Sequence, residues 1–140
     1  MGVTIKSKNF SIDIGCGGFL RLRTKIAELT APDIFEHYKN LTDGMFKMGE
    51  DRNTFYEKYD KNTAELEEKY GKSDIFDFLY ESDCDGKMDM QHCNSIYEVI
   101  KDYDDNICYG YAGRKDCAMF KDFKNVVKDG IDTEKGFEWW

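Results

Sequence analysis

The sequence predicts a helix-rich α+β fold, a single compact domain over residues 1–140 with a small antiparallel sheet. Apolar residues alternate near the N-terminus, as in a β-hairpin with one buried face, and later segments repeat them at helical spacing. A chain of 140 residues is too short for two independent cores, and its 41% of hydrophobic residues suffices for one. We therefore expect a folded domain rather than a disordered chain.

The sheet is expected to begin with a hairpin whose strands lie near residues 3–7 and 10–14. The apolar positions of this hairpin follow a period of two: Val3, Ile5, Phe10, Ile12 and Ile14. A further strand is predicted near residues 107–111, where aliphatic and aromatic residues stand between polar turn residues. We expect this strand to join the hairpin.

The first helices are predicted after a glycine-rich break at residues 15–18, which separates the hairpin from a helix near 19–29. Thr30 is expected to be the N-cap of a second helix, with Pro32 in its first turn. Apolar residues at helical spacing carry this second helix to about residue 41.

A highly charged helix is predicted near residues 52–70, with Gly71 as its C-terminal cap. Ser73 is then expected to cap a short helix and Asp89 a longer one, with a loop over residues 81–88 between them.

The last helix is expected to start at Asp116 as its N-cap and to close at Gly130. The aromatic residues at the end of the chain are expected to fold back onto the domain rather than to stay exposed as an anchor for a partner. They are Phe137, Trp139 and Trp140.

The net charge of −8 is unevenly distributed. Residues 1–27 carry five basic residues against one acidic residue, a net charge of +4, so the remainder carries −12. Most of the surface should repel phosphate, and we expect no direct binding to nucleic acid and no attraction to anionic lipid. A local basic patch from the N-terminal segment could still bind one anion.

The apolar stretches are far shorter than the roughly 20 residues that cross a bilayer, and no signal segment follows Met1, so we expect a cytoplasmic protein without membrane contact. The five cysteines are odd in number and lack regular close spacing, which favours reduced thiols. They are Cys16, Cys84, Cys93, Cys108 and Cys117.

The segment from Ile12 to Gly18 resembles the glycine-rich first motif of S-adenosylmethionine-dependent methyltransferases, in which glycines let the backbone approach the cofactor. Phe19 replaces the third glycine of that motif, and 140 residues with so few predicted strands do not accommodate a doubly wound sheet. We therefore expect no cofactor.

The same turn has a second interpretation, because backbone N–H groups at the start of a helix favour an anion or a thiolate. Cys16 at that position could be reactive, with Arg21 and Arg23 close in sequence. In the alternative interpretation, the glycines allow a tight reversal of the chain and Cys16 packs inside.

The acidic segment from Glu81 to His92 can be aligned with a calcium-binding EF-hand loop, with Gly86 as the turn glycine. His92 then stands where the bidentate glutamate is required, so the segment is predicted to be a plain acidic connection. His92 and Cys93 also lack the paired spacing of a zinc site, and we expect no metal.

Aromatic and basic residues meet again at Tyr109, Tyr111 and Arg114, a combination that can recognise a peptide or a single base. The same residues can also form an edge strand and its turn. The sequence shows no Ser/His/Asp order and no phosphate-loop lysine.

Five segments of this chain resemble a group of small uncharacterised bacterial proteins of phage and mobile-element type, associated with gut Firmicutes. The segments are residues 6–15 (KSKNFSIDIG), 18–23 (GFLRLR), 102–106 (DYDDN), 109–114 (YGYAGR) and 118–123 (AMFKDF). The resemblance implies a bacterial cytoplasm and no enzyme class, and it assigns no role to any residue.

We expect an acidic interaction protein that binds a protein partner and modulates a host process, for example by mimicking nucleic acid in a basic groove. The alternative is an enzyme that uses a small ligand or an anion through Cys16 and the basic N-terminal helix. Clustering of Cys16, Arg21 and Arg23 in one pocket would favour the enzyme, and their dispersal would favour the binding protein. The oligomeric state is not predicted.

Overall fold

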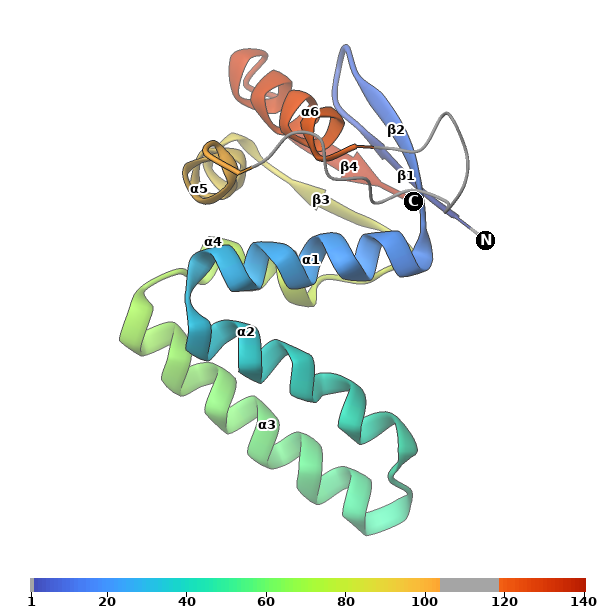
Figure 1. Ribbon diagram of the computed structural model, residues 1–140, viewed down its shortest axis with the longest axis vertical. Helices are drawn as coiled ribbons and strands as arrows, with labels where there is room; N and C mark the ends of the chain where they lie inside the picture. Colours follow the sequence, from blue (N-terminus) through green and yellow to red (C-terminus); the bar gives the residue numbers. More distant parts are fainter. Residues whose placement is uncertain (1, 104–118) are drawn as a thin grey trace.

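The structure is a computed structural model that describes residues 2–103 and 119–140. The described residues form six α-helices, one 3-10 helix (η1) and four strands (Figure 1). In chain order these are β1 (Gly2–Lys6), β2 (Ser11–Gly15), α1 (Cys16–Thr30), α2 (Pro32–Lys39), η1 (Asn40–Phe46), α3 (Gly49–Tyr70), α4 (Ser73–Tyr80), β3 (Gly86–Met88), α5 (Met90–Ile100), α6 (Phe120–Asp132) and β4 (Phe137–Trp139).

The four strands form one antiparallel sheet in the order β2-β1-β4-β3, which confirms the predicted α+β class and the N-terminal hairpin. Phe10 precedes β2 and is 45% exposed, so it is not part of the buried face that the alternation predicted. Phe137 and Trp139, which were expected to fold back, are buried in β4, whereas Trp140 follows β4 and is 53% exposed. β3 lies inside the predicted loop 81–88. The strand predicted at 107–111 lies outside the described residues.

The helices begin at different residues from those predicted. α1 starts at Cys16, three residues before the predicted start near residue 19. Gly17 and Gly18 are tolerated in its first turn, where the backbone N–H groups have no partner within the helix. Ala31, not Thr30, precedes α2, and the Thr30 hydroxyl donates to the Ile26 carbonyl at 2.7 Å as part of α1. Lys72, not Ser73, stands at the N-cap of α4.

The caps predicted at Gly71 and Asp89 are confirmed. Gly71 has a φ of 62° at the end of α3, and the Asp89 carboxylate accepts a hydrogen bond from the His92 backbone at 2.9 Å.

α6 has Met119 at its N-cap, and Asp116 lies outside the described residues. Gly130 does not close α6, which continues to Asp132, and an added Cβ there would lie 2.8 Å from Cys93 Sγ. The glycine therefore serves the packing of α6.

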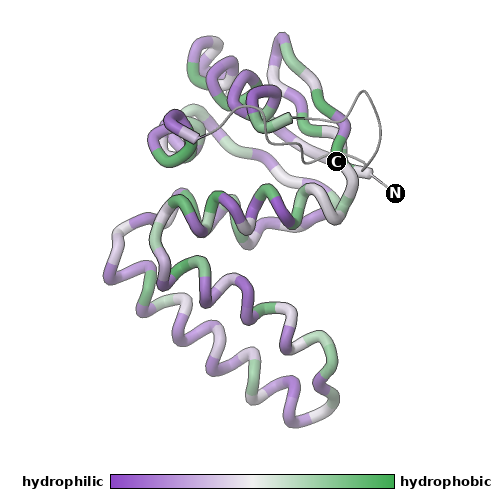
Figure 2. Tube along the Cα trace, viewed as in Figure 1, coloured by the Kyte–Doolittle hydropathy of each residue, from purple (hydrophilic) through white to green (hydrophobic). Residues whose placement is uncertain are grey.

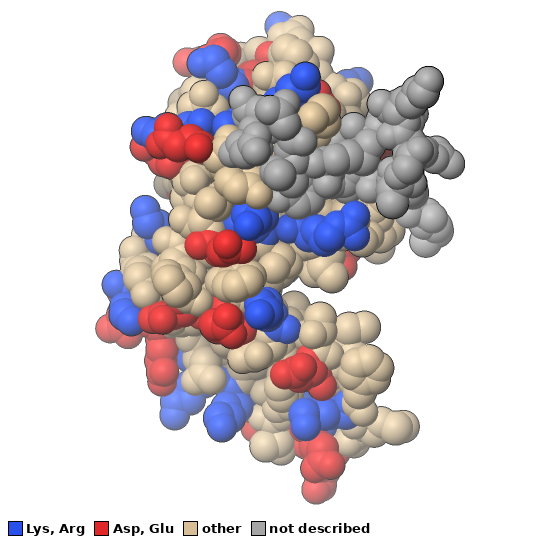
Figure 3. Space-filling model, in the orientation of Figure 1, with Lys and Arg blue, Asp and Glu red and all other residues tan. Residues whose placement is uncertain are grey.

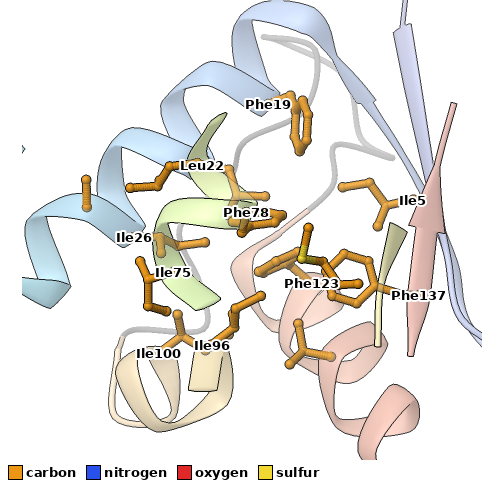
Figure 4. Close-up of a cluster of buried hydrophobic side chains, with 14 of the residues drawn as sticks. Ile5, Phe19, Leu22, Ile26, Ile75, Phe78, Ile96, Ile100, Phe123 and Phe137 are labelled. Atoms are coloured by element: carbon orange, nitrogen blue, oxygen red, sulfur yellow. The ribbon is translucent and has the colours of Figure 1, made fainter. Parts of the chain in front are cut away.

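The core lies between one face of the sheet and helices α1, α4, α5 and α6. Its central side chains come from all four of these helices and from β1 and β4 (Figure 4). They include Ile5, Phe19, Leu22, Ile26, Ile75, Phe78, Ile96, Ile100, Phe123 and Phe137. No helix in the described part of the chain is both long and apolar enough to cross a membrane.

Helices α2 and α3, with η1 between them, form a hairpin that extends away from the sheet (Figure 1). Hydrophilic residues occupy much of α3 (Figure 2), and Tyr59 is its buried residue. The hairpin therefore presents most of α3 to solvent, whereas α2 contributes Ile34 and Tyr38 to the core.

Candidate functional site

The N-terminal residues predicted to form a site lie in different environments. α1 leaves Cys16 and Arg21 exposed, and it turns Arg23 into the core with an exposed fraction of 2%. Figure 3 shows basic side chains in a row over α1. Tyr109, Tyr111 and Arg114 lie outside the described residues.

Arg23 lies in an aromatic cage. Its guanidinium carbon is 4.3 Å from the ring centre of Phe19, and the rings of Phe78 and Trp139 follow at 5.4 and 5.5 Å. Arg23 Nη1 donates to Asp83 Oδ1 at 2.6 Å, whereas its Nε and Nη2 have no hydrogen-bond partner among the described residues. Burial lowers the pKa of Arg23, and the nearby Tyr38 and Asp83 oppose that change.

This arrangement makes Arg23 a structural residue. It fixes the loop after α4 through Asp83, and Trp139 Nε1 fixes the same loop by donating to the Ser82 carbonyl at 2.8 Å. The sequence signal for this role was the helical spacing of Arg23 with Phe19 and Ile26 on the apolar stripe of α1.

A cavity of about 400 Å³ lies between α3 and α4, and we call it the tyrosine pocket. Its lining consists of three aromatic residues, one threonine and four acidic residues. They are Tyr59, Phe76, Tyr80, Thr63, Asp60, Glu67, Asp77 and Glu81. This pocket was not predicted from the sequence. Its two sides are visible there as a Tyr59-Thr63-Glu67 stripe at i, i+4 and i+8 on α3 and a Phe76-Tyr80 pair on α4.

The tyrosines of the pocket are held by their neighbours. The hydroxyls of Tyr59 and Tyr80 share a hydrogen bond of 2.7 Å. The Tyr59 ring stacks on His37 with ring centres 3.9 Å apart, and His37 Nε2 lies 2.6 Å from Thr63 Oγ1. Burial raises the pKa of both tyrosines, so their hydroxyls stay protonated near neutral pH.

The charge of the tyrosine pocket is strongly negative, because its lining among the described residues holds four carboxylates and no lysine or arginine. Asp60 and Glu81 are exposed, and Glu67 is half-buried. A cation entering such a pocket gains carboxylate partners and aromatic surface together. The pocket is therefore suited to an ammonium or guanidinium group.

Asp77 also belongs to a cluster around His92, which joins α4 to α5. His92 Nδ1 lies 2.7 Å from Asp89 Oδ1 and its Nε2 lies 2.8 Å from Asp77 Oδ2. An ionised carboxylate can only accept, so both contacts are hydrogen bonds when both ring nitrogens carry protons. Partial burial opposes protonation, but the contacts with Asp77 and Asp89 outweigh it and raise the pKa of His92.

Metal binding by this cluster competes with that ion pairing. Within the described residues, Asp74, Asp77 and His92 can place one ligand atom each within 4.8 Å of one another. A doubly protonated imidazole has no lone pair for a metal, so a metal must displace a proton and break a contact with a carboxylate. In the segment aligned with an EF-hand, His92 lies within α5 and Asp83 pairs with Arg23, so these residues are already in use.

The tip of the α2–α3 hairpin exposes three large apolar side chains. Met45, Phe46 and Met48 are 67%, 89% and 85% exposed. Single exposed apolar residues are common on protein surfaces, but adjacent methionine and phenylalanine side chains at a projecting tip are typical of surfaces that bind another protein.

Comparisons with known proteins give no relative from which a function could be transferred. The chain matches no protein-family model, no curated protein and no solved structure. The interpretation of the site therefore depends on the geometry and chemistry of its own residues.

Proposed function

We propose that this chain is a protein-binding module that accepts a lysine or arginine side chain of its partner in the tyrosine pocket. The observation that carries the proposal is a cavity of about 400 Å³ in which aromatic rings and four carboxylates occur together, with no lysine or arginine among the described residues that line it. The expected cytoplasmic location and the phage or mobile-element type remain predictions within this proposal.

A cation is the favoured ligand for two physical reasons. Asp77 is already paired with His92, whereas the other three carboxylates form no ion pair within 4.0 Å among the described residues, so a positive group in the pocket gains ion pairs there. The aromatic side of the pocket supplies apolar surface for the carbon chain of lysine or arginine and π-electrons for its charged end. Most of this surface comes from the half-buried Tyr80, because Tyr59 and Phe76 are only 6% and 3% exposed.

A protein partner is favoured over a free amine because the same hairpin exposes Met45, Phe46 and Met48 at its tip. An apolar tip contributes to the binding of a second protein and has no role for a small hydrophilic amine. The net charge of −8 would also attract a basic partner and raise the rate of association.

The proposal can be tested by calorimetric titration with capped pentapeptides that differ only at the central residue. One peptide carries arginine, the second lysine, and the third citrulline, which has nearly the shape of arginine without its charge. We expect the arginine and lysine peptides to bind at least about tenfold more tightly than the citrulline peptide, because a charge-assisted contact is lost. Equal binding of the citrulline peptide, or tighter binding of spermidine than of the peptides, would contradict the proposal.

Matched variants separate the pocket from the general negative charge. Asp60→Asn with Glu67→Gln removes two carboxylates of the pocket, whereas Glu65→Gln with Glu68→Gln removes two from the exposed surface of α3. We expect the first pair to weaken binding of the arginine peptide about tenfold and the second pair less than about twofold. Equal losses would show that long-range charge alone attracts the peptide.

A further inference from the structure

A second cavity, of about 360 Å³, lies beside the sheet and has the opposite charge, and we call it the lysine pocket. Four lysines and one glutamate line it, in a chain whose net charge is −8. Its lining residues are Lys6, Ser7, Lys8, Lys87, Lys135, Gly136, Phe137 and Glu138.

The sheet places two of these lysines on one face. Lys6 on β1 and Lys87 on β3 are both register partners of Glu138 on β4, the strand between them. Directly opposed residues of antiparallel strands project from the same face, so Lys6, Glu138 and Lys87 form a row across three strands. The neighbouring positions Ile5 and Phe137 are buried on the other face.

The backbone next to Lys8 is held by hydrogen bonds to α6. Asp129, 7% exposed, accepts hydrogen bonds from the Asn9 backbone N–H and from Asn9 Nδ2, each at 2.8 Å. The Ser7 backbone N–H donates to the Phe10 carbonyl at 2.9 Å and closes the turn, and Ser7 itself is 4% exposed. The turn between β1 and β2 is thus closed by its own backbone and anchored to α6 by two hydrogen bonds next to Lys8.

Lys135 is held by the close approach of the chain at Gly136. Gly136 has a φ of 69°, and an added Cβ would overlap the Met88 carbonyl of β3. All four lysines of the pocket therefore extend from strands or anchored turns, so their backbone positions around the pocket are fixed.

The four ammonium groups of the pocket are not neutralised by ion pairs among the described residues. Among the described residues, none of Lys6, Lys8, Lys87 and Lys135 forms an ion pair within 4.0 Å, and Glu138 is the one carboxylate of the lining. Another lysine-rich hollow, of about 190 Å³ on α5 and α6, differs in this respect. There Lys124 Nζ donates to the carbonyls of Lys101 and Tyr103, and Lys101 pairs with Glu98 at 3.0 Å.

We propose that the lysine pocket binds the phosphate group of a small ligand. Lysine is a common point-charge partner of phosphate, and a dianion between four ammonium groups relieves their mutual repulsion. A single phosphate group fits the pocket better than a nucleic-acid strand, because residues 28–140 carry a net charge of −12 that repels a chain of phosphates.

The probes for this site are inorganic pyrophosphate and AMP, titrated into the full chain while backbone amide signals are followed by NMR. We expect saturable shifts at Ser7, Lys8 and Gly136 that weaken as salt is added. Lys8→Gln with Lys135→Gln should weaken binding at least about tenfold. Lys58→Gln with Lys61→Gln removes the same charge from exposed positions of α3 and should change binding less than about twofold.

Three results would overturn the inference. Equal losses in the two double variants would mean that net charge, not the pocket, sets the affinity. Shifts that do not saturate below about 10 mM of either probe would indicate an adventitious ion only. Binding of single-stranded oligonucleotides that tightens with length would identify a polyanion surface instead of a site for one phosphate group. Thermal melting of each variant verifies that the fold is intact.

Discussion

The hydroxyl of Tyr59 on α3 lies 2.7 Å from the hydroxyl of Tyr80 on α4, and this hydrogen bond links the projecting hairpin to the core helices. Tyr80 also packs on Phe76, with nearly parallel rings 6.1 Å apart. Tyr59 and Tyr80 both line the tyrosine pocket. The stability of the hairpin and the shape of the proposed binding site therefore depend on the same hydrogen bond between these two tyrosines.

Removal of either hydroxyl should therefore lower the stability of the domain. We expect Tyr59→Phe and Tyr80→Phe each to reduce the free energy of unfolding by about 1 kcal/mol, because each leaves a part-buried hydroxyl without its partner. The double variant should lose less than the sum of the two. Urea denaturation measures these values, with Tyr56→Phe on α3 as the control, and fully additive losses would show that the hydroxyls do not interact.

Substitution of Asp83 should lower the stability of the protein more than substitution of Arg23, although the two residues form one ion pair. Asp83→Asn should destabilise the protein by about 1–2 kcal/mol, because the buried guanidinium keeps its charge and loses its ionic partner. Arg23→Met should change stability by less than about 1.5 kcal/mol, since methionine fills much of the volume and removes two nitrogens that lack partners.

The same denaturation experiments include two checks on this pair. Asp85→Asn, an exposed acidic residue of the same loop, should leave stability within about 0.5 kcal/mol of the original protein. Asp83→Asn should have almost no effect once Arg23 is methionine. A loss above about 3 kcal/mol in Arg23→Met would mean that the buried charge itself stabilises the fold.

The two histidines should titrate on opposite sides of the ordinary histidine pKa. The contacts of His92 with Asp77 and Asp89 raise its pKa against the effect of partial burial, whereas burial beside Tyr59 lowers the pKa of His37. NMR titration of the imidazole C–H signals measures both, and His92→Gln assigns them. If His92 titrates below His37, the ion-pair interpretation of the His92 cluster is wrong.

The His92 contacts also predict how stability depends on pH. A raised pKa in the folded state gives stabilisation that is complete below the unfolded pKa of about 6.5 and is lost as the pH rises through the folded value. Thermal melting should thus show a larger difference between the original protein and His92→Gln near pH 6 than near pH 8. A difference that grows with pH would contradict this assignment.

The sequence predicted the elements whose signals are local. The alternation of Val3 and Ile5 and the caps at Gly71 and Asp89 depend on neighbouring residues, and the structure confirms them. β3 and β4 have three residues each, too few for a periodic signal, and β4 becomes a strand only because β1 and β3 flank it.

The sequence carries the residue stripe of each side of the tyrosine pocket, but not the pocket itself, because its two sides come from separate helices whose relative position is set by tertiary packing. Tyr59 and Tyr80 are 21 residues apart, and their hydroxyls meet only once α3 lies against α4. Arg23 was predicted as a candidate binding residue beside Cys16 and Arg21, and charged residues are mostly exposed. Its position on the apolar stripe of α1 and the aromatic rings around it outweigh that preference.

The central claim is that a basic side chain enters the tyrosine pocket, and the most direct test is a map of NMR shifts in the isotope-labelled protein on adding the arginine pentapeptide. We predict that the largest changes occur at Tyr59, Thr63 and Tyr80, that they saturate, and that the citrulline peptide produces almost none. Changes of equal size with both peptides, or changes that leave these three residues untouched, would contradict the account.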